Sequence, residues 1–219
     1  MIDPQSQESR EVSANAAEYR RAFVWRVHQL LRMGYERLVP AEYADEEEPG
    51  ITGDLEQAIQ AVCDDPRSPD WVMQFASSDD PPVNVPGRKG KRRPRIDLRI
   101  VSLERRPRSR FCFEAKRLGP AHGPSKYWGK DGLGCFLRGD YAREEEDGGM
   151  LGYIQSAEEP LWVASLQAGL SDPACGLIEY GAWRRYDLGP ECLPAYQTKH
   201  MRREPNRPIT ICHTLLAFR

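Results

Sequence analysis

Apolar residues near the start of the chain recur at steps of three and four positions. Between residues 14 and 33 they are Ala16, Tyr19, Phe23, Val27, Leu30 and Leu31. This spacing lines one face of an amphipathic helix, and the following Gly34 is a natural stop. The segment "MIDPQSQESREV" ahead of it is polar. The pattern therefore predicts a flexible N-terminus over residues 1–13 and a helix over residues 14–33.

A second helix is indicated by "ITGDLEQAIQAVC", residues 51–63, in which Thr52 is the expected N-cap. The loop before it carries an acidic run: Asp45, Glu46, Glu47 and Glu48. After it comes a stretch rich in proline and turn residues with one short apolar run, "WVMQF" at residues 71–75. This run is interpreted as a first strand at a sheet edge, and the following "PPVNVPGRKGKRR" as a mobile basic loop.

Two later runs alternate in the way that strands do. In residues 96–103, Ile96, Leu98 and Ile100 alternate with Asp97, Arg99 and Val101. In residues 110–118, Phe111, Phe113 and Ala115 alternate with Cys112, Glu114 and Lys116. The connection "ERRPRS" has the length of a hairpin turn. The two runs therefore predict a β-hairpin.

The second half of the chain is glycine-rich at first, with apolar residues at helix-like intervals over residues 133–141 and 150–154. "AEEPLWVASLQAGL" predicts a helix over residues 157–170 with Pro160 in its first turn. "RPITICHTLLAFR" at the end predicts a closing strand. This order predicts an α/β fold, with a small mixed central sheet flanked by helices, in a single domain over residues 14–219.

The composition is that of a soluble globular protein: 219 residues, 40% hydrophobic and 29% charged. No apolar run is long enough for a bilayer and no secretion signal is visible, so we expect a cytoplasmic protein without a membrane partner. The six cysteines form no CxxC pair, and buried free thiols are the favoured interpretation. The alternative is a zinc site, which would use Cys175, Cys192, His200 and either Cys212 or His213.

The net charge of −2 conceals a strong asymmetry along the chain. Residues 42–80 hold twelve acidic side chains and a single basic one, Arg67. Residues 88–118 hold thirteen lysines and arginines against three acidic residues. A basic block beside two apolar strands favours a polyanion partner, most plausibly nucleic acid, over the alternative of a solvated hairpin.

Carboxylates are costly among packed aliphatic side chains unless something compensates their charge. In a strand, Glu114 and Lys116 project to the same face, and a hairpin partner brings Asp97 beside them. The two carboxylates and the carbonyl oxygen of Ala115 are the hard ligands that Mg²⁺ prefers. Lys116 would then position a water or offset charge on a phosphate. The alternative is a salt-bridged hairpin in which Glu114 pairs with Arg99 or Arg117.

The pattern D-x16-E-A-K resembles the PD-(D/E)xK nuclease superfamily. "RID" stands where the family often shows "PD", and "FEAKR" is the better half of the match. The resemblance covers most of the chain in outline, and in motif only the hairpin segment. It implies a restriction-endonuclease-like core and a Mg²⁺-dependent deoxyribonuclease in which Mn²⁺ substitutes. Asp97, Glu114 and Lys116 would be catalytic, and Asp97, Glu114 and the Ala115 carbonyl would hold the metal.

The family often adds a glutamate from the helix before the first strand. Here Glu47, Glu48 and Glu56 are available, and we favour Glu48 because it stands just ahead of the predicted helix. The alternative is that the acidic run is a solvated loop near a positive helix N-terminus.

Nucleic-acid contacts are expected from the cations around this motif: Lys91, Arg92, Arg93, Arg95, Lys126, Lys130 and Arg138. The neighbouring Tyr127, Trp128, Phe136 and Tyr141 would either contact bases or belong to the core. Gln155 lies on a predicted helix, where some family branches place an active-site glutamine.

The segment "KYWGKDGLGCFLRGDYAREEEDGGMLGYIQS" is loosely similar to stand-alone bacterial nucleases of antiviral defence. That likeness implies phage defence and action as a homodimer or as a subunit of a larger complex. Two alternatives stay open. One is a catalytically inactive nucleic-acid-binding or partner-docking subunit that kept the fold, and the other is an RNase on the same scaffold.

Overall fold

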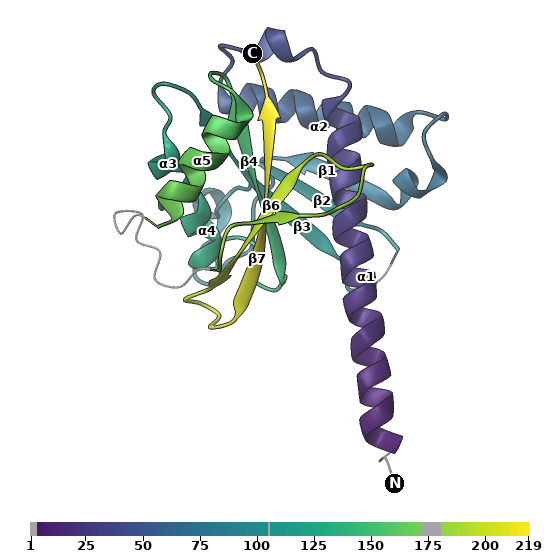
Figure 1. Ribbon diagram of the computed structural model, residues 1–219. Coiled ribbons are helices and arrows are strands. Elements are labelled where there is room, and N and C mark those ends of the chain that lie inside the picture. The colour runs from purple at the N-terminus through teal and green to yellow at the C-terminus, as the bar shows by residue number, and fades with distance from the viewer. Residues whose placement is uncertain (1–3, 105, 172–180) are drawn as a thin grey trace.

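The structure of the protein is a computed structural model that describes residues 4–104, 106–171 and 181–219. Among these residues a mixed seven-stranded sheet runs in the order β1-β2-β3-β4-β7-β6-β5 (Figure 1). β3 and β7 flank β4 in parallel, and all other neighbours are antiparallel. The strands are β1 (Phe75–Asp79), β2 (Leu98–Ser102), β3 (Arg110–Leu118), β4 (Asp147–Ile154), β5 (Arg184–Tyr186), β6 (Ala195–Met201) and β7 (Pro208–Ala217).

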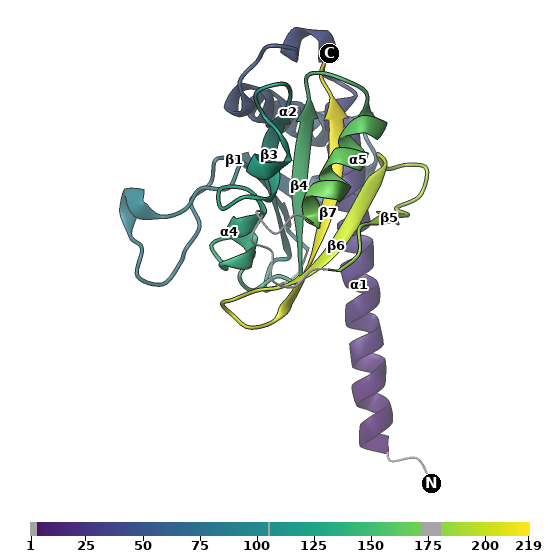
Figure 2. The same cartoon turned by 60° about the vertical axis from the view of Figure 1, so that its left-hand side comes forward.

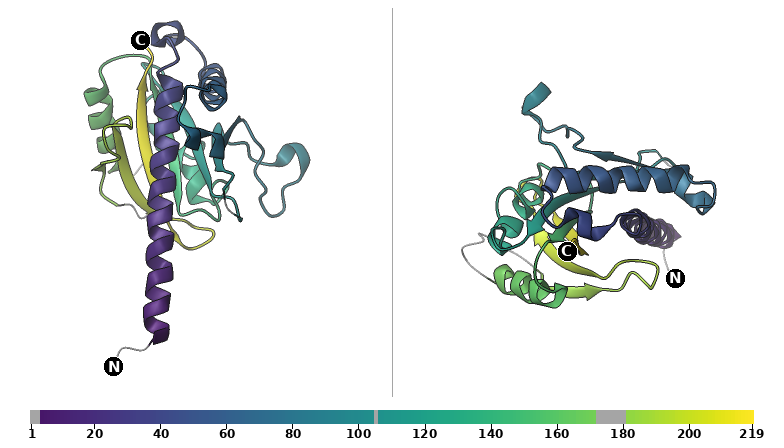
Figure 3. Two further views of the ribbon diagram at one scale, coloured as in Figure 1. Left: turned by 90° about the vertical axis from the view of Figure 1, so that its right-hand side faces the viewer. Right: turned by 90° about the horizontal axis from the view of Figure 1, so that it is seen from above.

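Helices cover both faces of this sheet (Figures 2 and 3). One face is packed by α1 (Pro4–Tyr35) and α2 (Glu48–Asp64), and the other by α3 (Pro124–Trp128), α4 (Leu133–Leu137) and α5 (Glu159–Leu170). The N-terminal half of α1 runs on past the sheet and stands clear of the other elements in Figures 1 and 2 and in the left view of Figure 3. Short 3-10 helices are η1 (Pro40–Tyr43), η2 (Asp70–Gln74) and η3 (Gly90–Arg92). No helix within the described ranges has the length and apolar character needed to cross a membrane.

The alternation of β3 divides the core into two layers. Phe111, Phe113 and Ala115 are buried in the cluster that includes α1 and α2, whereas Cys112 and Leu118 belong to the cluster around α3, α4 and α5. Side chains at alternate strand positions point to opposite faces, so Glu114 and Lys116 share the face of Cys112 and Leu118. The predicted alternation of this strand is confirmed.

The predicted hairpin is also confirmed, because β2 and β3 pair antiparallel with Leu98 opposite Phe113. β3 has the predicted bounds and β2 is shorter than predicted by a few residues at its ends. The helix α5, with Pro160 in its first turn, and the closing strand β7 are confirmed as well. The α/β class and the mixed sheet between helices therefore stand.

One strand prediction was wrong over most of its length, and one helix-like interpretation was wrong. Residues 71–74 of the predicted first strand lie in η2, where Val72 is buried and Met73 is 66% exposed, and the strand begins only at Phe75. Residues 150–154, read as helix-like, form the core of β4. A strand buried on both faces shows no period-two pattern, so its apolar run cannot be distinguished from a helix by spacing. β5 and β6 were not predicted.

Two helix starts also differ from prediction. α1 begins at Pro4 rather than at residue 14, and the flexibility of residues 1–13 stays a prediction. α2 begins at Glu48, with Glu47 at the N-cap. Thr52 is therefore not a cap: its hydroxyl donates to the carbonyl oxygen of Glu48 (2.9 Å) and lies 2.9 Å from the hydroxyl of Tyr153. Pro49 lies in the first turn of α2, where proline is favoured, and this accounts for a helix that starts earlier in the chain than predicted.

Candidate active site

Asp97 and Glu114 are brought together by the register of the β2–β3 hairpin. Leu98 pairs with Phe113, so the same register places the preceding Asp97 opposite Glu114. Oδ2 of Asp97 accepts a hydrogen bond of 2.7 Å from the backbone N–H of Ala115. The predicted meeting of the two acidic positions across the hairpin is therefore present in the structure.

Lys116 lies within this group of oxygens. Its Nζ donates to Oε1 of Glu114 (2.7 Å) and to the carbonyl oxygen of Ala115 (2.5 Å). A third hydrogen bond, of 2.9 Å, joins it to Oε1 of Glu48 on α2. The partner of Glu114 is thus Lys116, and not Arg99 or Arg117 as in the salt-bridged alternative.

Glu48 reaches the site because α2 begins next to the end of β3. Its Oε1 binds Lys116, and its Oε2 accepts the backbone N–H of Arg117 at 3.1 Å. A carboxylate in the first turn of a helix is also favoured by the helix dipole. The two other candidates lie elsewhere: Glu47 is exposed and pairs with the guanidinium of Arg117, and Glu56 accepts hydrogen bonds from Ser77 and Gln60, between α2 and β1.

Burial makes this cluster electrostatically unusual. Glu114 is 4% exposed, and its Oε2 is buried without a hydrogen-bond partner. Burial, followed by the charge of Asp97, raises the pKa of Glu114 to about 8, and burial likewise raises the pKa of Asp97. Burial lowers the pKa of Lys116, but Glu114, Glu48 and Asp97 together raise it by more, so the net shift is upward. The oxygens of the site therefore favour a cation at this position.

The oxygens suit a hard divalent cation, although the ammonium of Lys116 holds the position between them. In the described part of the chain, no three Asp, Glu, His or Cys side chains form a group arranged to hold a metal ion. Lys116 stands between Glu48 and Glu114, and Asp97 is bonded to backbone. The unpartnered Oε2 of Glu114 and the carboxylate and carbonyl donors fit Mg²⁺, which prefers oxygen ligands. Its binding would require Lys116 to move.

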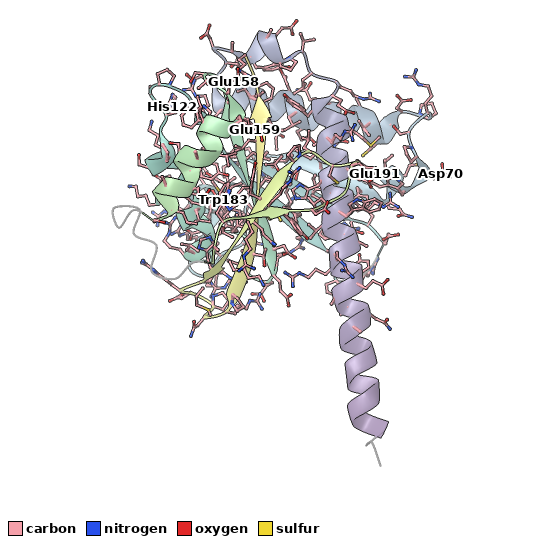
Figure 4. All side chains as sticks on the ribbon, in the orientation of Figure 1. Asp70, His122, Glu158, Glu159, Trp183 and Glu191 are labelled. Atoms are coloured by element: carbon pink, nitrogen blue, oxygen red, sulfur yellow. The ribbon has the colours of Figure 1, made fainter. Side chains whose placement is uncertain are left out.

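A pocket of about 250 Å³ opens beside Lys116. It is lined by Glu47, Glu48, Pro49, Lys116, Arg117, His122 and Lys126. Figure 4 labels His122, on the loop between β3 and α3. Its Nδ1 lies 3.4 Å from Nζ of Lys126, and burial, with the charges of Arg117 and Lys126, lowers its pKa.

Arg117 and His122 were not among the predicted site residues. For His122 the reason is that a lone histidine after a strand carries no motif. A larger cavity of about 480 Å³ lies near the opposite end of β3, where Arg110 and Phe111 contribute to its lining. It contains none of the residues of the carboxylate–lysine cluster. Chemistry rather than size therefore identifies the candidate site.

The predicted nucleic-acid contacts fall into two groups. Lys91, Arg92 and Arg95 are exposed on the loop between β1 and β2, and Arg93 beside them is half-buried and bonds Asn84. Lys126 and Lys130 are exposed at α3 and the turn after it, while the guanidinium of Arg138 pairs with Asp140.

The aromatic side chains near the motif do not form a surface. Tyr127, Trp128, Phe136 and Tyr141 are all buried, so the core interpretation holds and the base-contact interpretation is wrong. Gln155 is not on a helix but follows β4, and its Nε2 donates to the carbonyl oxygens of Tyr43 (2.8 Å) and Glu46 (2.7 Å). Gln155 therefore restrains the segment that leads to Glu48, and it forms no hydrogen bond with Lys116.

The zinc alternative finds no support among the described residues. Cys175 lies outside them. His200 and His213 both contact the hydroxyl of Thr198, at 2.7 and 2.8 Å. Cys192 and Cys212 are buried in the other core layer, with α1 and α2. The described cysteines and histidines of this set are thus divided between opposite faces of the sheet.

Comparison with protein-family models, with curated proteins and with solved structures gave no match. The PD-(D/E)xK resemblance therefore depends on the hairpin motif and on the geometry described above. The observed fold is α/β, with a seven-stranded mixed sheet among the described residues.

Proposed function

We propose that the chain is a Mg²⁺-dependent nuclease of PD-(D/E)xK type, with a restriction-endonuclease-like core, that hydrolyses phosphodiester bonds of DNA. One observation supports this most strongly. Three carboxylates gather around the ammonium of Lys116: Asp97 just ahead of β2, Glu114 on β3 and Glu48 at the start of α2. Such a group is costly to bury, and metal-dependent phosphodiester hydrolysis uses carboxylates and a cation together.

In this proposal Asp97, Glu114 and the carbonyl oxygen of Ala115 hold Mg²⁺, Mn²⁺ substitutes, and Glu48 completes the ligand set. When bound, the metal would polarise a phosphoryl oxygen and lower the pKa of a water molecule. The buried Oε2 of Glu114, which lacks a partner, supports the donor set.

Lys116 has two tasks in this mechanism. Without metal, its Nζ compensates Glu48 and Glu114 at 2.9 and 2.7 Å. The lysine side chain is a flexible four-carbon stem, so the ammonium can leave these carboxylates for the adjoining pocket. There it would donate hydrogen bonds to a non-bridging phosphate oxygen and stabilise the charge that develops during attack.

Binding of the DNA backbone is assigned to cations around the site, all of them exposed except the half-buried Arg93. Lys91, Arg92, Arg93 and Arg95 on one side, and Lys126, Lys130 and Arg138 on the other, would contact phosphates. A homodimer or a larger complex, a cytoplasmic location and a role in phage defence are parts of the proposal that rest on analogy.

A catalytically inactive nucleic-acid-binding subunit is the second candidate, and one observation favours it. Lys116 already neutralises part of the carboxylate charge, and the described residues contain no ready group for a metal. A chain that kept the fold and the basic surface without catalysis would show the same internal ion pairs.

Cleavage assays on the full chain separate these candidates. Wild type is expected to nick supercoiled DNA with Mg²⁺ or Mn²⁺ and to stop with a chelator, and RNA of the same sequence tests the RNase alternative. Asp97→Asn, Glu114→Gln and Lys116→Met should each abolish cleavage. The control Glu42→Gln, in the acidic segment of residues 42–80, should leave cleavage unchanged. Salt-sensitive DNA binding without cleavage would favour the inactive subunit. Full cleavage by Asp97→Asn and Lys116→Met would remove these residues from the mechanism.

A further inference from the structure

The connection between β1 and β2 forms an arm, defined here as residues 82–95. It stands off the body of the molecule in Figures 2 and 3. Pro82 and Arg95 form an isolated antiparallel bridge at its base, and the N–H of Val83 donates to the carbonyl oxygen of Pro94 at 2.8 Å. The two chain segments are thus held side by side at the base of the arm, and η3 lies near its tip.

The arm is strongly basic throughout. Its cations are Arg88, Lys89, Lys91, Arg92, Arg93 and Arg95, and it contains no acidic and no aromatic residue. Gly87 and Gly90 have φ angles of +79° and +57°, and nothing lies within 4 Å of the position that a Cβ would take at either. These glycines permit the left-handed turns of the tip, and the space around the tip is open.

We propose that this arm enters the major groove of duplex DNA and that the substrate is therefore double-stranded. The inference rests on the proposed function, because it takes DNA as the substrate of the carboxylate–lysine site. Two paired segments lie about 4.8 Å apart before their side chains are counted. That width suits the major groove, which is about 12 Å wide, and exceeds what a minor groove of about 6 Å admits.

Among the residues that the structure describes, the absence of exposed aromatic side chains argues against a single-stranded substrate. Proteins that bind single strands stack bases on exposed aromatic side chains. In the described part of the chain every Phe, Tyr and Trp is buried or half-buried, and those nearest the motif are buried. The surface around the site therefore offers charge for phosphates, and arginines whose forks match guanine edges in a major groove.

The base of the arm is fixed to the candidate site. The carbonyl oxygen of Asp97 accepts the backbone N–H of Asp80 at 3.1 Å, at the foot of the arm. At the same foot, the hydroxyl of Tyr141 donates to the carbonyl oxygen of Arg95. Further along the arm, Arg88 forms an ion pair with Asp140 at 3.6 Å. A duplex gripped by the arm would consequently lie beside Asp97, where the carboxylates gather.

Binding measured without divalent metal tests the arm separately from catalysis. The arm variant is Lys89→Gln/Lys91→Gln/Arg92→Gln, in which all three replaced side chains are exposed. The control is Arg184→Gln/Arg185→Gln/Lys199→Gln, which removes the same charge from exposed positions on β5 and β6. We expect wild type to prefer a duplex over its separate strands. The arm variant should bind the duplex about tenfold to a hundredfold more weakly, with a salt dependence shallower by about 3 in log–log slope. The control should keep wild-type affinity.

Methylation interference identifies the groove. Methyl groups on guanine N7 lie in the major groove, and those on adenine N3 lie in the minor groove. We expect N7 methylation to weaken binding of wild type and to have no further effect on the arm variant. Interference from adenine N3 alone, equal affinity for single strands, or a duplex affinity unchanged in the arm variant would overturn the inference. A result in which the arm variant loses only the association between protein copies would also overturn the inference.

Failure of this inference and failure of the proposed function give different results. Cleavage by wild type that is equal on single and double strands and unaffected in the arm variant contradicts the arm but keeps the nuclease. Arm-dependent duplex binding without cleavage in Mg²⁺ or Mn²⁺ keeps the arm as a duplex-binding element and contradicts the nuclease.

Discussion

Glu48 on α2 and Lys116 on β3 are joined by a hydrogen bond of 2.9 Å across 68 positions of the chain. The second oxygen of the same carboxylate accepts the backbone N–H of Arg117. One side chain thus fixes the start of a helix to the end of a strand. The candidate site exists only where these two elements meet, so its ligand set depends on tertiary packing as well as on the hairpin.

Replacing Glu48 should weaken metal binding more than replacing its neighbour. Glu48→Gln removes a charge that is held 2.9 Å from Lys116, whereas Glu47→Gln removes a carboxylate that is 71% exposed and pairs with Arg117. Loss of one carboxylate ligand should raise the dissociation constant for Mn²⁺ about tenfold or more, by analogy with the losses seen when metal-site residues are removed. Titration calorimetry with Mn²⁺ measures both variants. Equal losses in the two variants would mean that Glu48 has no special place in the ligand set.

Lys116→Met should destabilise the metal-free protein and make its stability depend on metal. The substitution leaves Glu114 buried without its partner, and breaking such a pair costs about 3 to 5 kcal/mol. A divalent cation would then compensate the carboxylates without competition from the ammonium. The free energy of urea unfolding should therefore rise with Mn²⁺ by more in the variant than in wild type.

The matched control for this experiment is Lys126→Met. Lys126 lines the same pocket as Lys116 but is exposed. Its loss should therefore change neither the free energy of unfolding nor the response to Mn²⁺ by a comparable amount. If Mn²⁺ fails to raise the stability of Lys116→Met, the cluster is a structural ion pair rather than a metal site.

Gln155→Leu should act on the site from a distance. Gln155 donates to the carbonyl oxygens of Tyr43 and Glu46, and so restrains the segment that ends at Glu48. Loss of two hydrogen bonds should lower the free energy of unfolding by about 1 to 3 kcal/mol. Mn²⁺ affinity should also fall, but by less than in Glu48→Gln. Gln155→Asn, which keeps the amide but shortens the reach, should lie between. An unchanged Mn²⁺ affinity would confine Gln155 to a role in folding stability.

The hairpin motif was predictable because β3 has one strictly alternating pattern. Phe113 and Ala115 turn to α1 and α2, so Glu114 and Lys116 must share the other face of the sheet. The short turn leaves Asp97 as the nearest position across the hairpin. Local rules of strand geometry were sufficient here. The convergence of Asp97, Glu114 and Lys116 therefore followed from the sequence.

The remaining features depend on contacts that no local pattern encodes. Glu48 and Glu47 differ in role only because α2 begins against the end of β3, and both look alike in an acidic run. β4 carries Gly149, where a Cβ would lie 2.2 Å from the Phe113 ring, so its glycines reflect close packing rather than a turn. Its burial on both faces also removed the alternation that would have identified it as a strand.

His28 of α1 is a buried histidine on the opposite face of β3 from the candidate site, and its protonation should control acid stability. Its ring makes edge contacts with Phe111 and Phe113, and its Nε2 has no hydrogen-bond partner. Burial lowers the pKa of His28 from 6.5 to about 4. The charged form is thus disfavoured in the folded protein, while the unfolded chain takes up the proton at the ordinary pKa.

Stability should consequently fall as the pH decreases from about 6.5 to about 4, because only the unfolded chain is protonated in that window. A pKa difference of this size corresponds to a loss of about 3 kcal/mol from His28 alone, with full stability retained above the window. His28→Leu, which keeps an apolar side chain of similar volume, should flatten the dependence of unfolding free energy on pH by up to one proton. Part of the slope should remain, since burial also lowers the pKa of His213. Urea unfolding of both proteins at several pH values measures the difference, and an unchanged slope in His28→Leu would show that His28 is not the group whose protonation destabilises the fold.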